Sequence, residues 1–244
     1  MPPPREAGEK PRGGGTPPRR QKPRRCAGRF LISAWAVRPE RHAGRVPAAF
    51  DPQPILLTGR HVRLEPLTPR HLPALIEAAH DPETFRYYVT RPLGEEGEMA
   101  KWMDGVLKGQ AAGTDVGWAT VRVSDGRVVG ATTFLAIRRV SRGLEIGNTW
   151  IAPEAQRTAI NTEAKYLQLR HAFEQLGAWR VQLKTDERNA KSRAAIARLG
   201  ASCEGILRKY QLRFDGFVRN TAMYSLLAEE WPAAKAALEA KLGR

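Results

Sequence analysis

Apolar residues recur along the chain at two different spacings, and the spacing predicts the element that each segment forms. Residues 56–67 alternate apolar and polar side chains through Val62 and Leu64, which predicts a strand with one buried face. After Thr68, a residue type favoured just before a helix, apolar residues return at helical spacing. Residues 95–112 repeat the helical pattern, so we expect two helices after the first strand.

The middle of the chain predicts a hairpin, and the end predicts strand–helix units. Residues 116–123 and 128–137 flank an Asp-Gly turn, which is typical of a β-hairpin. The other expected elements are a strand at 144–151, a helix at 162–176, a strand at 179–185, a helix at 190–199, hairpin strands at 203–214 and 217–227, and a last helix that carries Trp231, Leu238 and Leu242. The order β-α-α-β-β-β-α-β-α-β-β-α predicts one α/β domain over residues 55–244, with a mixed sheet and helices on both faces.

The first 54 residues differ in composition from the rest of the chain. They hold 12 Lys/Arg against 4 Asp/Glu, and 11 of the 18 prolines. Such a segment has little to bury, so we expect either a disordered extension or a stretch that results from a misassigned translation start. The alternative is a basic arm that makes nonspecific contact with nucleic acid or the ribosome, since clustered arginines bind phosphate without sequence preference.

Cysteine content and hydropathy exclude several classes. Cys26 and Cys203 belong to no CxxC or Cys/His cluster, so we expect no metal site and no disulfide framework. Cys203 is expected in the core, as a small buried residue. No segment approaches the ~20 consecutive apolar residues of a membrane helix, so we expect no membrane partner. A cytoplasmic location is the simplest inference.

Residues 144–161 carry the strongest functional signal. A buried strand is expected to break at Pro153 into a short loop that opens a helix. Free backbone N–H groups and the positive end of the helix dipole would then point at one place. That arrangement predicts an anion site that suits phosphate best.

Several short motifs occur together in the order found in a known family. They are the E-I-G-N-T-W-I strand, the Q-R-T loop, the spacing of Asn189 and Ser192, the R-L-G-A helix end and the R-N-T-x-M-Y-S strand. With them, residues 55–227 resemble the GNAT superfamily of acetyl-CoA-dependent N-acetyltransferases, and most of all its RimJ/RimL-type branch, which acetylates protein N-termini. The resemblance implies the GNAT fold, acetyl-CoA as co-substrate and a primary amine as acceptor.

The resemblance also implies which residues hold coenzyme A. The pyrophosphate would lie on the N–H groups of residues 157–161, and the pantetheine arm between the 144–151 and 179–185 strands. The implied binding residues are Trp150, Ile151, Gln156, Arg157, Thr158, Ala159, Ile160, Asn161, Thr162, Asn189 and Ser192. Ala159 stands where the family has glycine, which lets backbone approach phosphate closely, so cofactor affinity should be lower. For Asn189 and Ser192, helix capping is the alternative role.

An amine attacks a thioester only when it is neutral, so a base is useful. Glu145 is the candidate base and Ser192 the candidate acid, while Tyr210 and Tyr224 are alternative proton donors. The alternative for Glu145 is a structural ion pair with an arginine. An α-amine of pKa ~8 is neutral far more often at pH 7 than a lysine of pKa ~10.4, which favours a protein N-terminus as acceptor.

Other functions stay open. The chain could acetylate a small-molecule amine such as an antibiotic or an amino acid. It could also be a degenerate scaffold that binds coenzyme A and uses the basic extension to contact nucleic acid. A monomer and a homodimer are both compatible with the sequence.

Overall fold

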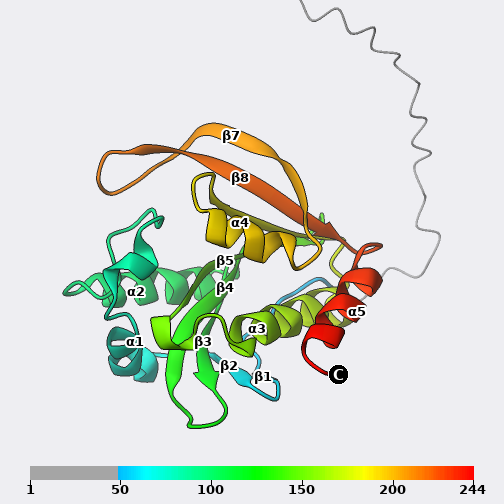
Figure 1. The fold of residues 1–244 in the computed structure, drawn as a ribbon, viewed down its shortest axis with the longest axis horizontal. Coiled ribbons are helices and arrows are strands. Elements are labelled where there is room, and N and C mark those ends of the chain that lie inside the picture. Colours follow the sequence, from blue (N-terminus) through cyan, green and yellow to red (C-terminus); the bar gives the residue numbers. More distant parts are fainter. Residues whose placement is uncertain (1–48) are drawn as a thin grey trace, which may run out of the picture. The chain divides into compact units, whose positions relative to one another are not determined.

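An eight-stranded mixed sheet forms the centre of the fold in the computed structural model, which describes residues 49–244 (Figure 1). The strand order is β1-β2-β3-β4-β5-β6-β8-β7; β5 and β6 are parallel, and the other neighbours are antiparallel. The strands are β1 (Leu57–Thr58), β2 (Val62–Pro66), β3 (Val116–Arg122), β4 (Val128–Arg138), β5 (Gly143–Ile151), β6 (Arg180–Asp186), β7 (Ser202–Leu212) and β8 (Val218–Leu227). The predicted mixed α/β fold is confirmed.

Five α-helices surround the sheet in this part of the chain. They are α1 (Leu72–Ala78), α2 (Glu98–Ala111), α3 (Ala159–Arg170), α4 (Ala190–Ala197) and α5 (Trp231–Lys241). Short 3-10 turns cover η1 (Pro69–His71), η2 (Pro82–Phe85) and η3 (Pro153–Ala155), and a π-helical turn, η4 (His171–Gln175), extends α3. Among the residues described, no helix is long and apolar enough to cross a membrane.

The predicted extension, residues 1–54, falls almost wholly on residues 1–48, which lie outside the described residues. Its last residues contact the domain. Phe50 is buried in the core, and Asp51 pairs with Arg139 at 2.8 Å. The folded part therefore includes residues before the expected boundary at 55.

The first predicted strand is a hairpin instead of a single strand. β1 pairs with β2 through Leu57↔Leu64, and the chain turns between them. The carboxylate of Glu163, on α3, accepts the backbone N–H groups of Arg60, His61 and Val62 at 2.9, 2.6 and 2.9 Å. Burial alone would raise the pKa of Glu163, but these N–H groups outweigh it and hold the pKa below its usual value. This distant carboxylate is why the continuous alternation of 56–67 does not produce one strand.

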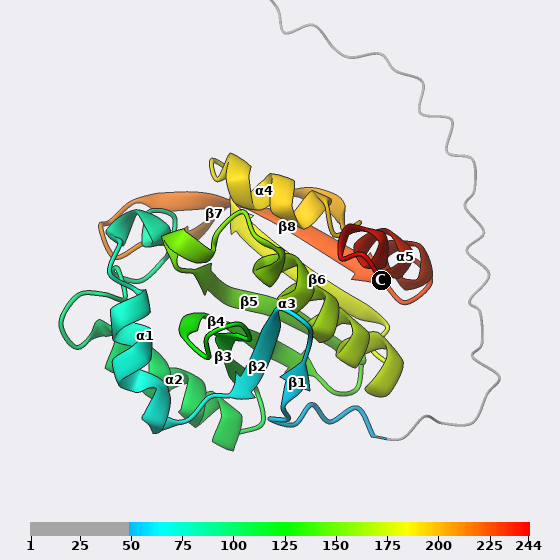
Figure 2. The same ribbon diagram turned by 60° about the horizontal axis from the view of Figure 1, so that its bottom comes forward.

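Two apolar cores lie on opposite faces of the sheet. Helix α3 and strand residues such as Trp118 and Phe134 form the larger core, while α1 and α2 pack on the other face over Ala119 and Ala131. Figures 1 and 2 show α1 and α2 grouped together, apart from α3 and α5. The division follows from strand geometry, because successive side chains point to opposite faces.

Two further expectations need correction. Helix α3 begins at Ala159, not at Thr162, because Thr158 supplies the cap: its hydroxyl accepts the N–H of Ile160 at 3.3 Å. Cys203 is exposed and not in the core, since it lies on β7, the edge strand of the sheet. The remaining helix and strand limits differ from the predicted ones by a few residues.

Candidate active site

Strands β5 and β6 separate partway along their length. They pair through Gly143↔Arg180, Leu144↔Val181 and Glu145↔Gln182, and no further pair joins them in the described residues. Beyond Glu145, β5 carries a bulge: its register with β4 shifts between Gly147 and Trp150, and Asn148 has a φ of 48°. The bulge turns β5 away from its neighbour and leaves backbone groups of both strands without a ladder partner.

A cavity of about 750 Å³ lies along this opening. Residues of β5, β6, the loop before α3, the first turns of α3 and α4, the segment after η2 and the end of the β7–β8 hairpin line it. Every residue predicted to bind the coenzyme or to act in catalysis lines the cavity except Ala159, Ile160 and the two alternative proton donors, Tyr210 and Tyr224. Ile160 is instead buried in the core, and Ala159 packs partly buried against it.

One end of the cavity has the properties of an anion site. The turn η3 ends before Gln156, Arg157 follows with a φ of 60°, and α3 starts at Ala159. The first-turn N–H groups of α3 and the positive end of its dipole therefore face the loop. Because Ala159 is itself helical, its methyl group causes no backbone strain at the position where glycine was expected.

Sequence reasoning missed one cation at this end. The ammonium of Lys191, on α4, contacts the side-chain oxygen of Gln156, while Gln156 Nε2 donates to the carbonyl of Ile151 at 2.8 Å. Gln156 therefore bridges the end of β5 to α4, and Lys191 adds a second positive charge beside Arg157. Lys191 lies between Asn189 and Ser192, two residues predicted to bind the ligand, and this position was the available signal.

Asn189 is the N-cap of α4. Its Oδ1 accepts the N–H of Ser192 at 3.0 Å, so the capping alternative holds for Asn189. Both residues also line the cavity. Capping uses the oxygen of the Asn189 amide and leaves its NH₂ group to donate into the cavity.

Glu145 lies where the two strands part. Its side chain is 1% exposed; Gln182 Nε2 donates to it at 2.8 Å, and the ammonium of Lys184 lies 3.2 Å away. The alternative role expected for Glu145 was an ion pair with an arginine; its partners are instead the lysine Lys184 and the amide of Gln182. Gly147 makes room for this arrangement, since a Cβ there would meet Glu145 Oε1 at 2.9 Å.

A buried lysine stands behind the bulge, on the α3 face of the sheet, and was not predicted. Lys165 Nζ donates to Thr149 at 2.7 Å, to Thr132 at 2.9 Å and to Gln168 at 2.9 Å. Burial lowers the pKa of Lys165 to about 7, because no carboxylate offsets the loss of hydration. Lys165 lines the cavity from below and anchors the irregular part of β5.

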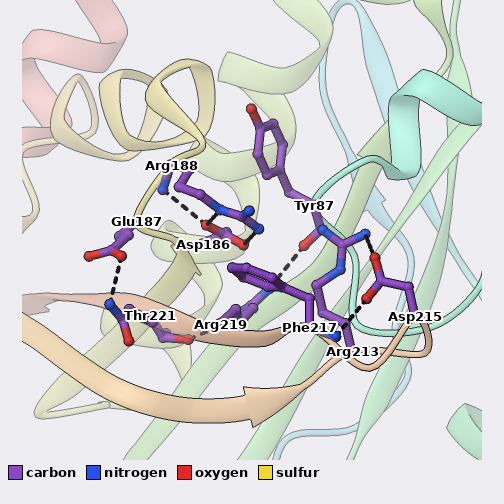
Figure 3. A network of polar contacts seen from close by, with 10 residues as sticks. Tyr87, Asp186, Glu187, Arg188, Arg213, Asp215, Phe217, Arg219 and Thr221 are labelled. Atoms are coloured by element: carbon purple, nitrogen blue, oxygen red, sulfur yellow. Dashed lines mark hydrogen bonds and ion pairs between the residues drawn. The ribbon is translucent and has the colours of Figure 1, made fainter. Parts of the chain in front are cut away.

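The wall opposite α4 joins two segments that are distant in sequence. Phe214, in the β7–β8 turn, donates its N–H to the carbonyl of Val89 at 2.8 Å. Arg219 Nη1, on β8, donates to the carbonyl of Tyr87 at 2.9 Å, as Figure 3 shows. The far hairpin and the segment after η2 therefore form one continuous wall.

The cavity thus runs along the opening between β5 and β6 to the loop before α3. Residues 61–202 match the family described as "Acetyltransferase (GNAT) domain", which is more than half of the chain. The chain belongs to this family, and the predicted class of enzyme, an acyltransferase, is confirmed.

Individual relatives agree with this assignment. A provisionally assigned acetyltransferase from T. thermophilus is 41% identical; the match covers 78% of this chain and 97% of that one, with a TM-score of 0.70. YdaF of Bacillus subtilis (strain 168), provisionally named a ribosomal N-acetyltransferase, is 36% identical over 111 residues, which are 46% of this chain and 60% of YdaF. Mycobacterium smegmatis RimJ in complex with CoA-disulfide shares the fold, with 22% identity, coverage of 78% and 96%, and a TM-score of 0.67. The predicted similarity to RimJ/RimL-like members is confirmed.

Proposed function

We propose that the protein is an acetyl-CoA-dependent N-acetyltransferase whose acceptor is the α-amine of a protein N-terminus. The observation that carries the proposal is the opening between β5 and β6, which runs from Glu145 to the N–H groups at the start of α3. A pantetheine arm is a chain with two amides, so it can pair with the strand edges that this opening exposes. A pyrophosphate at its end would meet the amide-lined loop.

The residues along the cavity fit such a ligand. Arg157 and Lys191 supply positive charge at the phosphate end, and the buried Oδ1 of Asn161 has no hydrogen-bond partner within residues 49–244. An orphaned buried polar atom is costly, and a ligand that donates to it removes the cost. The amide NH₂ of Asn189 and the hydroxyl of Ser192 would contact the pantetheine arm.

The reaction follows from the position of Glu145. The acceptor nitrogen attacks the acetyl carbonyl carbon; the C–N bond forms as the C–S bond breaks, and coenzyme A leaves as the thiolate. The nitrogen loses a proton, and Glu145 is the nearest candidate to accept it. A thiol has a pKa of ~8.5, so the thiolate needs little help in leaving, and Ser192 would be a minor proton donor.

The acceptor class rests on two arguments. An α-amine is the better nucleophile near neutral pH, because a larger fraction of it is uncharged. The relative YdaF carries the name of a ribosomal N-acetyltransferase, which also points to a protein acceptor.

The test is mass spectrometry of acceptors incubated with the protein and acetyl-CoA. A panel should contain short peptides with free α-amines, peptides whose only amine is a lysine, and small-molecule amines. We expect a mass increase of one acetyl group on the α-amine peptides. Acetylation confined to small amines would replace the protein acceptor with a small-molecule one, and no acetylation of any amine would refute the proposal.

A charge reversal at the phosphate end provides the matched variant. Arg157→Glu should abolish turnover by repelling the pyrophosphate, whereas Arg127→Glu, on the turn between β3 and β4, should leave turnover unchanged. Retained turnover in Arg157→Glu would contradict the proposed binding mode.

A further inference from the structure

Arg219 lies in the cavity wall, on the same face of the sheet as Glu145. Glu145 pairs with Gln182, Asp186 lies further along β6 on the same face, and Asp186 pairs with Thr221, two residues from Arg219. The side chain is 6% exposed and lines the cavity. Arg219 therefore lies on the side of the sheet that carries the candidate base, Glu145.

The guanidinium of Arg219 has neutral partners. Its Nε donates to the Thr221 hydroxyl at 3.2 Å, and its Nη1 donates to the Tyr87 carbonyl at 2.9 Å. Within residues 49–244 it is paired with no carboxylate. Its Nη2 group, which carries two donors, has no partner there.

Two carboxylates near Arg219 are paired with other arginines (Figure 3), and Glu145 is paired with Lys184. Asp186 accepts Nε and Nη2 of Arg188 at 2.9 and 2.8 Å. Asp215 pairs with Arg213 at 3.2 Å. Burial raises the pKa of Asp186, but the bonds from Arg188 outweigh that effect and lower it, so this carboxylate stays charged and occupied.

A buried guanidinium without an anion is costly. Burial lowers the pKa of Arg219, yet an arginine keeps its proton at any pH at which the protein works. The buried charge is therefore stabilised when a carboxylate enters the cavity and offers two oxygens to the free donors. Elsewhere on the cavity wall, buried hydroxyl or indole N–H groups have no partner among the described residues; they belong to Thr84, Tyr88, Trp102 and Trp150. Gln211, which pairs with Arg219 across the strands, contributes a buried acceptor, its Oε1, that also has no partner there.

We propose that Arg219 binds a carboxylate of the acceptor, so that the preferred acceptor carries an acidic side chain close to its reactive amine. The proposal rests on the N-acetyltransferase activity proposed above and adds the acceptor's chemistry to it. An acidic acceptor would supply a carboxylate to Arg219, since the neighbouring carboxylates are already paired with other cations.

The test compares acceptors that differ by one group. Short amidated peptides with a free α-amine would carry Asp or Asn at the second position, and Glu and Gln as free amino acids would form a second pair. Binding is measured by calorimetry in the presence of coenzyme A, and kcat/KM by release of the free thiol with acetyl-CoA. We expect the acid of the favoured pair to bind and react roughly ten- to a hundredfold better than its amide, the range for a hydrogen-bonded charge.

Variants then assign the preference to one residue. Arg219→Gln keeps a donor for the Tyr87 carbonyl and should bring acid and amide to equal affinity, while Arg219→Lys should retain part of the preference. Arg213→Gln is the matched control, because this arginine of the same hairpin already has its carboxylate and does not line the cavity. It should leave the preference intact.

The outcomes separate the two proposals. Equal binding of acid and amide by the wild-type protein, or a preference that survives in Arg219→Gln, would overturn the carboxylate site. Selective binding of the acid without any turnover would support the carboxylate site and refute the acetyltransferase function. A preference seen only with free amino acids would assign the carboxylate to a small-molecule acceptor.

Discussion

The ammonium nitrogen of Lys165 lies 2.7 Å from the hydroxyl of Thr149, and this contact ties the middle of α3 to the bulge of β5. The bulge separates β5 from β6, so the lysine supports the shape of the opening, and it also lines the cavity. All its hydrogen-bond partners are neutral oxygens. Burial therefore lowers the pKa of Lys165, and no negatively charged hydrogen-bond partner offsets this effect.

We expect the stability contributed by Lys165 to depend on pH. The folded-state pKa is about 7 and the ordinary value 10.5, so between them the unfolded chain binds a proton that the folded chain does not. The free energy of unfolding should rise with pH over this window. Urea unfolding at pH 7, 8 and 9 should show the difference between wild type and Lys165→Met shifting in favour of wild type as pH rises. Lys101→Met, at an exposed position, serves as the control, and parallel curves for Lys165→Met would refute the neutral buried lysine.

Glu145→Gln tests the assignment of the base. The amide fills the same space but cannot accept a proton, so kcat should fall by ~100-fold or more, the contribution of a positioned base. The KM for acetyl-CoA should stay within a factor of two or so. Glu204→Gln, in a surface pair with Arg180, is the control. An unchanged kcat would leave Glu145 as a structural partner of Lys184.

Asn189→Asp separates capping from coenzyme binding. Aspartate caps a helix as well as asparagine does, so the melting temperature should change little. It has no NH₂ group, however, so the KM for acetyl-CoA should rise several-fold if that group contacts the ligand. Asn189→Ala should lose ~1 kcal/mol of stability as well. An unaltered KM in the aspartate variant would assign Asn189 to capping alone.

Gly59→Ala should destabilise the β1–β2 hairpin. A Cβ at this position would lie 2.4 Å from Glu163 Cδ, inside the carboxylate that holds the turn. We expect a loss of roughly 1–3 kcal/mol in the free energy of unfolding. Gly105→Ala provides the contrast: it lies in α2 with nothing within 4 Å of the added methyl, so it should stabilise by ~0.5–1 kcal/mol. Equal effects of the two substitutions would refute the packing argument.

Local periodicity was enough to predict the mixed α/β fold and the position of almost every strand and helix. It failed at residues 56–67 because the turn is held by Glu163, which lies about a hundred positions away and leaves no local signal. The start of α3 was placed too late although Thr158 is a favoured cap residue. Here the signal was present but was overridden by the family pattern of the loop.

The candidate site was predicted in part. The strand–loop–helix pattern identified many of the residues that line the cavity at its loop end, because these are contiguous in sequence. Arg219 was not identified from the sequence. Its proposed role depends on contacts between distant segments, namely its bond to Tyr87 and the pairing of Asp186 with Arg188. Lys165 was not identified either, because its burial becomes apparent only in the structure, where most residues of α3 are buried.

The bond between Phe214 and Val89 couples the mobility of the two segments it joins. If that side of the cavity widens, the tip of the β7–β8 hairpin and residues 87–89 must move together. Otherwise the bond from Phe214 to Val89 and the bond from Arg219 to Tyr87 must both break. Acceptor exchange would then proceed by a concerted opening, with the amide of Phe214 as its reporter. Deuterium uptake at that single amide should slow when an acceptor occupies the cavity, even though the acceptor need not touch Phe214.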